Sequence, residues 1–243
     1  MTLHYEVRAA THRGYHRAHN EDRIAVDDWA SSATSSVPIV FHKSDCEPLI
    51  CMVADGMGGH AGGRLASRIA VQKSRKKLIK AASPEAVAET LEEVNQDMFS
   101  SMDEGTQGMG ATVAGVRIHL GNAFAFNVGD SRVYIFEGDK LKQLSIDDSF
   151  KDSRSNRKLS SAITQSLGGG FRRRRIDPHV VEKKLFTLQK ILICSDGLTD
   201  LVEDNELEEV MKIFPHNDVS RLLGLALDKG GTDNISIISI HVA

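Results

Sequence analysis

The sequence predicts an α+β protein in which helices pack outside antiparallel sheets. Short apolar runs bounded by Gly, Asp or Asn recur along the chain, and two long amphipathic segments stand together between them. A doubly wound fold would instead need regular alternation of strand and helix, which this order lacks. A chain of 243 residues buries roughly 70% of its unfolded surface, which is enough for one large domain without disulfide or metal staples.

The expected strands follow period two or form continuous apolar runs. Residues 3–10 alternate like a strand, residues 24–28 form a second short one, and the Ser/Ala/Thr-rich residues 30–36 predict a loop. Buried strands are then expected at residues 49–54, 111–118, 123–128, 133–136, 191–194 and 235–242. Residues 145–178 are polar and irregular, and no repeat of 20 to 50 residues occurs.

Helices are expected between these runs. Residues 64–81 gather their apolar side chains near one stripe, and Ser83-Pro84-Glu85 supplies an N-cap, a proline at N1 and an early acid for a helix that runs to about residue 102. Two shorter helices are expected at 203–213 and 217–229, the second capped by Asn217 or Asp218.

Composition excludes several classes of protein. Hydrophobic residues make up 41% and charged residues 26%, which is typical of a globular protein. A net charge of −3 and a pI near 6.4 argue against nucleic acid as a partner. The four arginines at 172–175 form the only strongly basic cluster, which is either a solvated loop or a site for an anion or a partner.

The cysteines and the apolar profile point to a cytoplasmic protein. Cys46, Cys51 and Cys194 are odd in number without C-x-x-C spacing, which favours a reducing compartment. The first ten residues show no apolar signal segment, and no window approaches the 18 or so apolar residues of a membrane span.

Acidic residues mark the ends of several expected strands. If the last two strands are antiparallel neighbours, Asp196 after one and Asp233 before the other share a rim of the sheet. Further acids at strand ends are Asp55, Asp130, Glu21 and Asp22. A single Asp-Gly is also a common turn signal, so each acid alone favours a turn. As an ensemble, carboxylates without thiolates favour a hard divalent cation such as Mg²⁺ or Mn²⁺.

Other catalytic motifs fit less well. The glycine-rich run after Asp55 lacks the G-K-[ST] ending of a nucleotide-binding P-loop. His12, His16 and His19 have a spacing that suits zinc, but Gly14 interrupts the segment, so a helical histidine face is not expected. The sequence has no H-E-x-x-H, G-x-S-x-G or EF-hand motif.

Seven short motifs in order along the chain resemble the metal-dependent serine/threonine protein phosphatases, the PPM or type 2C family, in their compact bacterial form. They are Arg17-Ala-His-Asn-Glu-Asp22, Val53-Ala-Asp-Gly-Met-Gly-Gly-His60, Gly108-Met-Gly-Ala-Thr112, Asn127-Val-Gly-Asp-Ser-Arg132, Ser166-Leu-Gly168, Cys194-Ser-Asp-Gly-Leu-Thr-Asp200 and Gly231-Thr-Asp-Asn234. The resemblance spans nearly the whole chain. It implies one catalytic domain, residues 1–243, folded as a four-layer α-β-β-α sandwich of two antiparallel sheets flanked by helices.

The resemblance also implies a site with two Mn²⁺ or Mg²⁺ ions and possible room for a third. Asp55 then resembles the carboxylate that bridges both metals, with the Gly56 carbonyl on the second and Asp196 and Asp233 on the first. Asp130, with Asp196, resembles the third-metal site, and Glu21 and Asp22 resemble outer ligands that hold metal-bound waters. Arg17 resembles the arginine that binds the phosphate, since its fork can hold two phosphoryl oxygens.

The implied reaction is hydrolysis of phosphoserine or phosphothreonine in proteins by metal-activated water, without a phosphoenzyme. Where some relatives have a histidine proton donor the chain has Met57, so His60 or a water is the candidate donor. The polar stretch between Leu144 and Ser166 resembles a short form of the family's flap. The substrates expected are those of a bacterial Ser/Thr kinase, with a possible link to type VI secretion. The alternatives are a phosphoprotein-binding module without turnover and a phosphatase for small esters.

Overall fold

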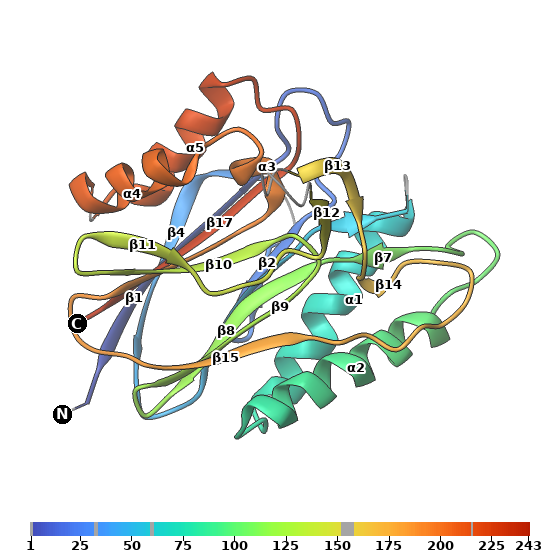
Figure 1. Ribbon diagram of the computed structural model, residues 1–243, viewed down its shortest axis with the longest axis horizontal. Helices are drawn as coiled ribbons and strands as arrows, with labels where there is room; N and C mark the ends of the chain where they lie inside the picture. Colours follow the sequence, from blue (N-terminus) through green and yellow to red (C-terminus); the bar gives the residue numbers. More distant parts are fainter. Residues whose placement is uncertain (1, 32–33, 59–60, 152–157, 215) are drawn as a thin grey trace.

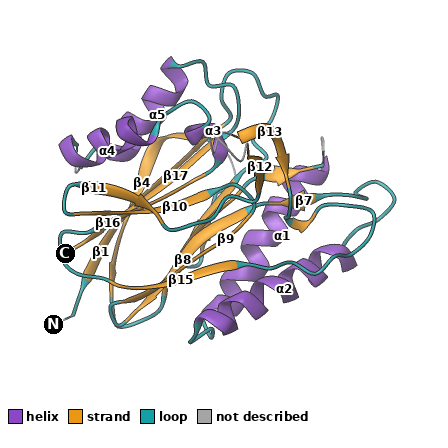
Figure 2. Cartoon of the chain, in the orientation of Figure 1, coloured by secondary structure: helices purple, strands orange, loops and turns teal. Residues whose placement is uncertain are grey.

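The computed structural model describes residues 2–31, 34–58, 61–151, 158–214 and 216–243. Two six-stranded sheets lie face to face, and helices cover the outer face of each (Figures 1 and 2). Every pairing of neighbouring strands within these two sheets is antiparallel. The predicted four-layer α-β-β-α sandwich is therefore confirmed.

The first sheet has the order β11-β10-β16-β17-β1-β4. Its strands in chain order are β1 (His4–His12), β4 (Ser35–Ser44), β10 (Arg132–Glu137), β11 (Lys140–Gln143), β16 (Lys190–Cys194) and β17 (Ile235–Val242). The two central strands β16 and β17 are nearly all buried, because both faces of this sheet are covered.

The second sheet has the order β15-β9-β8-β5-β2-β3. Its strands are β2 (Arg23–Val26), β3 (Trp29–Ala30), β5 (Leu49–Ala54), β8 (Val113–His119), β9 (Asn122–Val128) and β15 (His179–Lys184). Residues from both sheets, among them Val7, Ile193 and Ile238 from the first and Val53 and Val116 from the second, form the core between them.

Helices α1 (Ala61–Leu78) and α2 (Pro84–Ser100) cover the second sheet, and α3 (Asp196–Thr199), α4 (Asp204–Ile213) and α5 (Asp218–Asp228) cover the first (Figure 2). The predicted cap of α2 is confirmed, since the Ser83 hydroxyl accepts a hydrogen bond from the Ala86 N–H. Asn217 is the N-cap of α5 but makes no side-chain cap bond, whereas the Asp218 carboxylate accepts from the Val219 N–H.

Two small pairings lie at one end of the sandwich. Strands β6 (Gly56–Met57), β7 (Gly110–Ala111) and β14 (Leu167–Gly168) form a sheet with the order β14-β7-β6. Strands β12 (Ser149–Lys151) and β13 (Lys158–Ile163) form a hairpin above them (Figure 1). The expectation of an irregular stretch at residues 145–178 is thus wrong for β12, β13 and β14. Strands β12 and β14 are too short to show a period, and half of β13 (Lys158–Ile163) is polar.

The expected loop at residues 30–36 is also wrong at both ends, because Ala30 belongs to β3 and β4 begins at Ser35. Strand β4 is polar along much of its length and contains Pro38. It pairs only with β1, at the edge of the first sheet. An edge strand tolerates proline because the side without a neighbouring strand needs no backbone N–H donor. Strand β15 is likewise an edge strand, and it was not predicted.

Candidate active site

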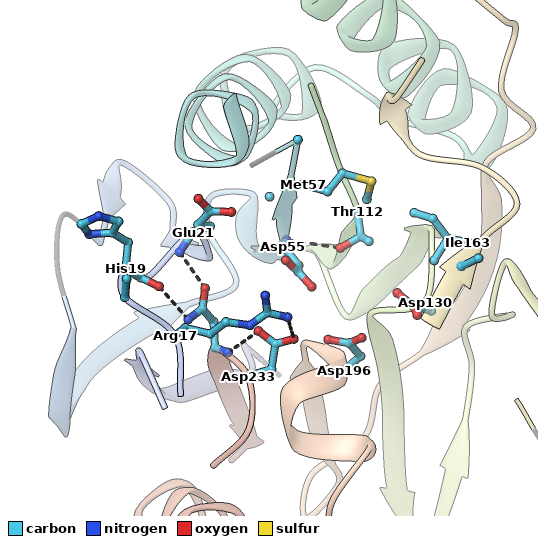
Figure 3. Close-up of a pocket in the computed structure, with 15 residues that line it drawn as sticks. Arg17, His19, Glu21, Asp55, Met57, Thr112, Asp130, Ile163, Asp196 and Asp233 are labelled. Carbon is cyan, nitrogen blue, oxygen red and sulfur yellow. Dashed lines mark hydrogen bonds and ion pairs between the residues drawn. The ribbon is translucent and has the colours of Figure 1, made fainter. Parts of the chain in front are cut away.

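A cavity of about 720 Å³ opens at the end of the sandwich beside β6 and the β12–β13 hairpin (Figure 3). In Figure 3 Asp55, Asp196 and Asp233 surround a common space, with Asp130 and Ile163 on one side and Glu21 on the other. The lining residues are Arg17, Ala18, His19, Glu21, Asp55, Gly56, Met57, Gly58, Thr112, Asp130, Ala162, Ile163, Asp196, Asp233 and Asn234. Six of the predicted acidic or basic site residues therefore line one cavity.

Asp196 and Asp233 reach this cavity from neighbouring strands. Strands β16 and β17 pair antiparallel with Cys194 opposite Ile237, so the end of one lies beside the start of the other. The turn after β16 needs Gly197, because a Cβ there would lie 2.0 Å from the Asn234 carbonyl oxygen. The strand pairing from which their proximity was predicted is confirmed.

Asp55 follows β5 and is held through its backbone. Its N–H donates to the Thr112 hydroxyl at 3.2 Å, its carbonyl accepts from the Thr112 N–H at 2.9 Å, and Thr112 contacts the Ser131 hydroxyl at 2.7 Å. Asp130, beside Ser131, is 4% exposed after the end of β9. Gly56 packs so closely that a Cβ would lie 2.0 Å from the Gly63 carbonyl oxygen, so β6 tolerates no larger residue there.

Arg17 reaches the cavity from the loop between β1 and β2. Its guanidinium contacts the Asp233 carboxylate at 2.6 Å, and 58% of its side chain is exposed. Hydrogen bonding to Asp233 raises the Arg17 pKa above its ordinary value. Asn234 fixes the loop, because its side chain accepts from the Glu21 N–H at 2.7 Å and donates to the Arg13 and His19 carbonyls at 2.8 and 2.9 Å.

Asp22 lies under the cavity and is completely buried. One of its carboxylate oxygens accepts hydrogen bonds from the Ser195 and Ser236 hydroxyls at 2.8 and 2.7 Å. The other, Oδ1, is buried and receives no hydrogen bond. Burial raises the Asp22 pKa to about 6, partly offset by the two serine bonds.

The carboxylates carry a concentration of negative charge. Burial raises the pKa of Asp55 well above its ordinary value, and the charges of Asp22, Asp196, Asp233 and Asp130 raise it further. Without a counter-charge, the carboxylates gathered around this cavity repel one another. In the described ranges, no three His, Cys, Asp or Glu side chains come together as a ready-made set of metal ligands.

The chemistry of this site nevertheless suits divalent cations. The acidic donors that line the cavity are hard carboxylate oxygens, which Mg²⁺ and Mn²⁺ prefer. The buried Oδ1 of Asp22 lacks a donor, and a nearby cation or the water that it binds can satisfy such an oxygen. The residues present therefore fit a metal site, and a bound cation would oppose the carboxylate repulsion that, after burial, raises the pKa of Asp55.

Asp22 lies behind the cavity lining and not on it. His60 lies outside the residues that the structure describes. Sequence reasoning missed the hydroxyls that hold the acids, namely Thr112, Ser195 and Ser236. A usable signal was present, since Thr112 and Ser195 stand inside two of the seven motifs and Ser236 is one of three polar residues in the predicted strand 235–242. Ala162 and Ile163 bring the hairpin to the cavity from the expected flap.

Comparison with known proteins agrees with this arrangement. The family model for protein phosphatase 2C matches residues 17–222. The serine/threonine phosphatase stp of Listeria monocytogenes is 31% identical over 98% of this chain and 96% of its own length.

Two solved structures are similar over almost their full length. One is PppA, described as a key regulatory component of the type VI secretion system in Pseudomonas aeruginosa, with 27% identity, a TM-score of 0.76 and 98% of each chain covered. The other is the catalytic domain of the serine/threonine protein phosphatase PstP in complex with two manganese ions, with 25% identity, a TM-score of 0.75 and 99% of each chain covered.

Fold, cavity and relatives together define an enzyme of the metal-dependent serine/threonine protein phosphatase class. Within that class, the chain belongs to the protein phosphatase 2C family. The predicted family and enzyme class are confirmed, and the manganese in the PstP structure supports the use of a divalent metal.

Proposed function

We propose that residues 1–243 act as a single catalytic domain that hydrolyses phosphoserine and phosphothreonine in proteins. The observation that carries the proposal is the cavity in which one arginine, Arg17, faces a group of carboxylates. A phosphate monoester is an anion, so carboxylates in such a site need cations before substrate can enter. An arginine beside them suits the phosphoryl oxygens that such cations would also attract.

We assign the inner metal ligands to Asp55, Asp196 and Asp233, with the Gly56 carbonyl as a further donor. Asp130 is the candidate for a third cation together with Asp196. When bound, two Mn²⁺ or Mg²⁺ ions neutralise charge on the phosphoryl group and lower the pKa of water. The buried Ser195 and Ser236 hydroxyls orient Asp22, and the Asn234 side chain fixes the backbone of Glu21, which suits both acids for an outer layer.

Arg17 is proposed to bind two oxygens of the phosphoryl group through its guanidinium fork. In the structure the Arg17 guanidinium pairs with Asp233. When a cation and substrate bind, Asp233 would turn to the cation and Arg17 to the phosphoryl group. Proton donation to the departing serine or threonine oxygen stays a prediction for His60, because Met57 lines the cavity and cannot supply a proton.

We infer that the enzyme works in bacterial signalling, where it reverses a Ser/Thr kinase in the cytoplasm. This inference is supported by bacterial relatives named serine/threonine phosphatase. A role beside type VI secretion is supported only by the likeness to PppA. No helix in the described part of the chain is long and apolar enough to cross a membrane.

Phosphate release from phosphoserine and phosphothreonine peptides, with and without Mn²⁺, tests the proposal. Asp196→Asn should reduce the rate by about 100-fold or more, because it removes a carboxylate from the cation site. Asp228→Asn is the matched control, since Asp228 is exposed on the last turn of α5 and is not among the residues that line the cavity. Equal rates for Asp196→Asn and the parent would overturn the assignment.

Calorimetry separates the enzyme from a binding module. The proposed enzyme needs metal for turnover, and its phosphopeptide is consumed during the titration. Tight phosphopeptide binding without metal dependence and without phosphate release would instead identify a phosphoprotein-binding module.

A further inference from the structure

The loop at residues 169–175 joins β14 to the segment before β15 and carries an exposed aromatic residue beside four arginines. Phe171 is 87% exposed, and all four arginines are exposed. An exposed phenylalanine keeps most of its apolar surface in water, so burial of its ring against a partner would be favourable. Figure 1 shows this segment running along the edge of the molecule beside α2.

The loop is held in shape by α2. Asn95, which is fully buried, accepts from the Gly168 N–H at 2.9 Å and donates to the Arg174 carbonyl at 2.8 Å, so one side chain joins the two ends of the loop. Glu92, one turn earlier, accepts from the Arg173 guanidinium at 2.9 Å and from the Ile176 N–H at 3.1 Å. These bonds fix the loop ends and leave its tip in solvent.

Three of the four arginines have no acidic partner among the residues that the structure describes. Arg173 pairs with Glu92, whereas Arg172, Arg174 and Arg175 make no ion pair within the described ranges. A preformed loop therefore presents three uncompensated positive charges around one aromatic ring.

The loop begins close to the cavity. Across the small sheet, Gly56 of β6 lies opposite Ala111 of β7, and Ala111 lies opposite Leu167 of β14. Two strand spacings place Leu167 about 10 Å from Gly56, which lines the cavity. Phe171 is four residues further on, so it lies within roughly 25 Å of Gly56. An extended peptide covers that span with about seven residues.

We propose that residues 169–175 dock an acidic segment of the phosphoprotein substrate, within about seven residues of the phosphorylated side chain, with Phe171 packing against an apolar residue of that segment. The proposal rests on the proposed function. Charge complementarity supports it, because arginine pairs with carboxylates through two parallel hydrogen bonds and such surfaces raise the rate of encounter. A single exposed aromatic on one loop gives too little apolar area to favour a membrane as the occupant.

The test compares hydrolysis of p-nitrophenyl phosphate with hydrolysis of two phosphothreonine peptides that differ only in having Glu or Gln at the flanking positions. The parent should prefer the acidic peptide, and the preference should fall as salt rises from about 50 to about 300 mM. The triple variant Arg172→Ala, Arg174→Ala, Arg175→Ala should lose about tenfold in kcat/KM on the acidic peptide alone. Phe171→Ala should lose roughly fivefold on both peptides.

Matched controls remove the same groups elsewhere. Lys76, Lys80 and Lys184 are exposed and lie at the end of the sandwich away from the cavity, so their triple alanine variant removes the same charge. Phe186→Ala removes an aromatic ring that is 60% exposed. Both controls should keep the parental kcat/KM on each of the two peptides. Replacement of Arg172, Arg174 and Arg175 by Glu should favour a peptide with lysine flanks.

Each outcome decides between supporting and overturning the proposal. Equal kcat/KM on acidic and neutral peptides, or an equal loss in the lysine control, would overturn the proposed docking by residues 169–175. The proposed phosphatase activity would still stand. If the loop variants lose only binding to anionic phospholipid vesicles, the loop is a membrane contact and the proposal is wrong. If the parent releases phosphate from none of the substrates, the proposed function fails and docking fails with it.

Discussion

The contact between Arg17 and Asp233 places a phosphate-binding candidate on a metal-ligand candidate. Both partners are partly exposed, with 58% and 34% of their side chains accessible, so the 2.6 Å pair is easily exchanged. The guanidinium supplies positive charge to a carboxylate that a cation would otherwise neutralise. Cation and arginine therefore compete for Asp233.

Arg17→Ala should consequently bind Mn²⁺ a few-fold more tightly while it loses about tenfold or more in kcat/KM, since the phosphoryl group loses its fork. Isothermal titration with Mn²⁺ and steady-state kinetics measure the two effects. Arg13→Ala, on the same loop, is the matched control. Unchanged Mn²⁺ affinity in Arg17→Ala would show that the pair does not limit metal binding.

The buried carboxyl of Asp22 should make the metal-free protein less stable as the pH rises. Its folded pKa of about 6 lies above its ordinary value of 3.8, so the folded state binds the proton more tightly. This stabilisation is complete below about pH 4 and is lost as the pH rises through about 6, and it amounts to at most about 3 kcal/mol.

Asp22→Asn removes this titrating group while an amide keeps hydrogen-bonding capacity toward the two serines. Denaturation in the presence of a chelator, at about pH 4 and about pH 7, should show a weaker loss of unfolding free energy in the variant than in the parent. Identical pH slopes for the two proteins would mean that another group controls this range.

At the scale of elements, Asp148 links three segments around the cavity. Its carboxylate accepts from the Gly129 N–H at 2.8 Å and from the Gln165 side chain at 2.8 Å, and it contacts the His179 ring at 2.9 Å. These contacts join the turn that carries Asp130, the segment after the β12–β13 hairpin and the start of β15.

Asp148→Ala should therefore lower kcat/KM by about tenfold, because it releases the turn before Asp130 without removing a group from the cavity. If Asp148 acts through position only, Asp148→Asn should recover much of the rate. Kinetics at rising Mn²⁺ separate the two causes: recovery at high Mn²⁺ indicates a misplaced ligand, and an unchanged deficit indicates a misplaced flap.

Most buried elements could be predicted from the sequence, and the edges could not. Strands β5, β9 and β17 are mostly apolar and almost wholly buried, and their expected and observed limits agree closely, because both of their faces are covered. Edge strands β4 and β15 lack that pattern, since one side of each faces solvent or carries charge. Their pairing depends on distant partners that no local period reveals.

The acids of the site were predictable because they stand at the ends of buried strands, whose limits the sequence indicates. Antiparallel pairing of β16 with β17 brings Asp196 and Asp233 to one rim, and the packing of the two sheets adds Asp55 from β5. The placement of Arg17 was predictable only from the motif that contains it. Its loop is shaped by Asn234, whose side chain bonds the Glu21 N–H from a position 213 residues further along the chain.

At the scale of the whole molecule, divalent cations should stabilise the fold, because the cavity carboxylates repel one another in their absence. At a free Mn²⁺ concentration of about 100 times Kd, the expected gain in unfolding free energy is about 2.7 kcal/mol per site. Thermal denaturation with Mn²⁺ or with a chelator measures it.

Asp196→Asn should lose most of this shift in Tm and Asp228→Asn should keep it. A shift of equal size in both variants would indicate that Mn²⁺ acts elsewhere on the surface. Mg²⁺ in the same assay would establish which of the two ions the cavity prefers.

The first and last strands run side by side and terminate together. His4 and Ala243 exchange backbone hydrogen bonds of 2.9 and 2.8 Å, whereas Asp233 lies just beyond the opposite end of β17. That strand spans about 25 Å. A bead or a solid support coupled beside either His4 or Ala243 would thus hold the molecule in the same orientation, with the cavity beside Asp233 facing the solvent.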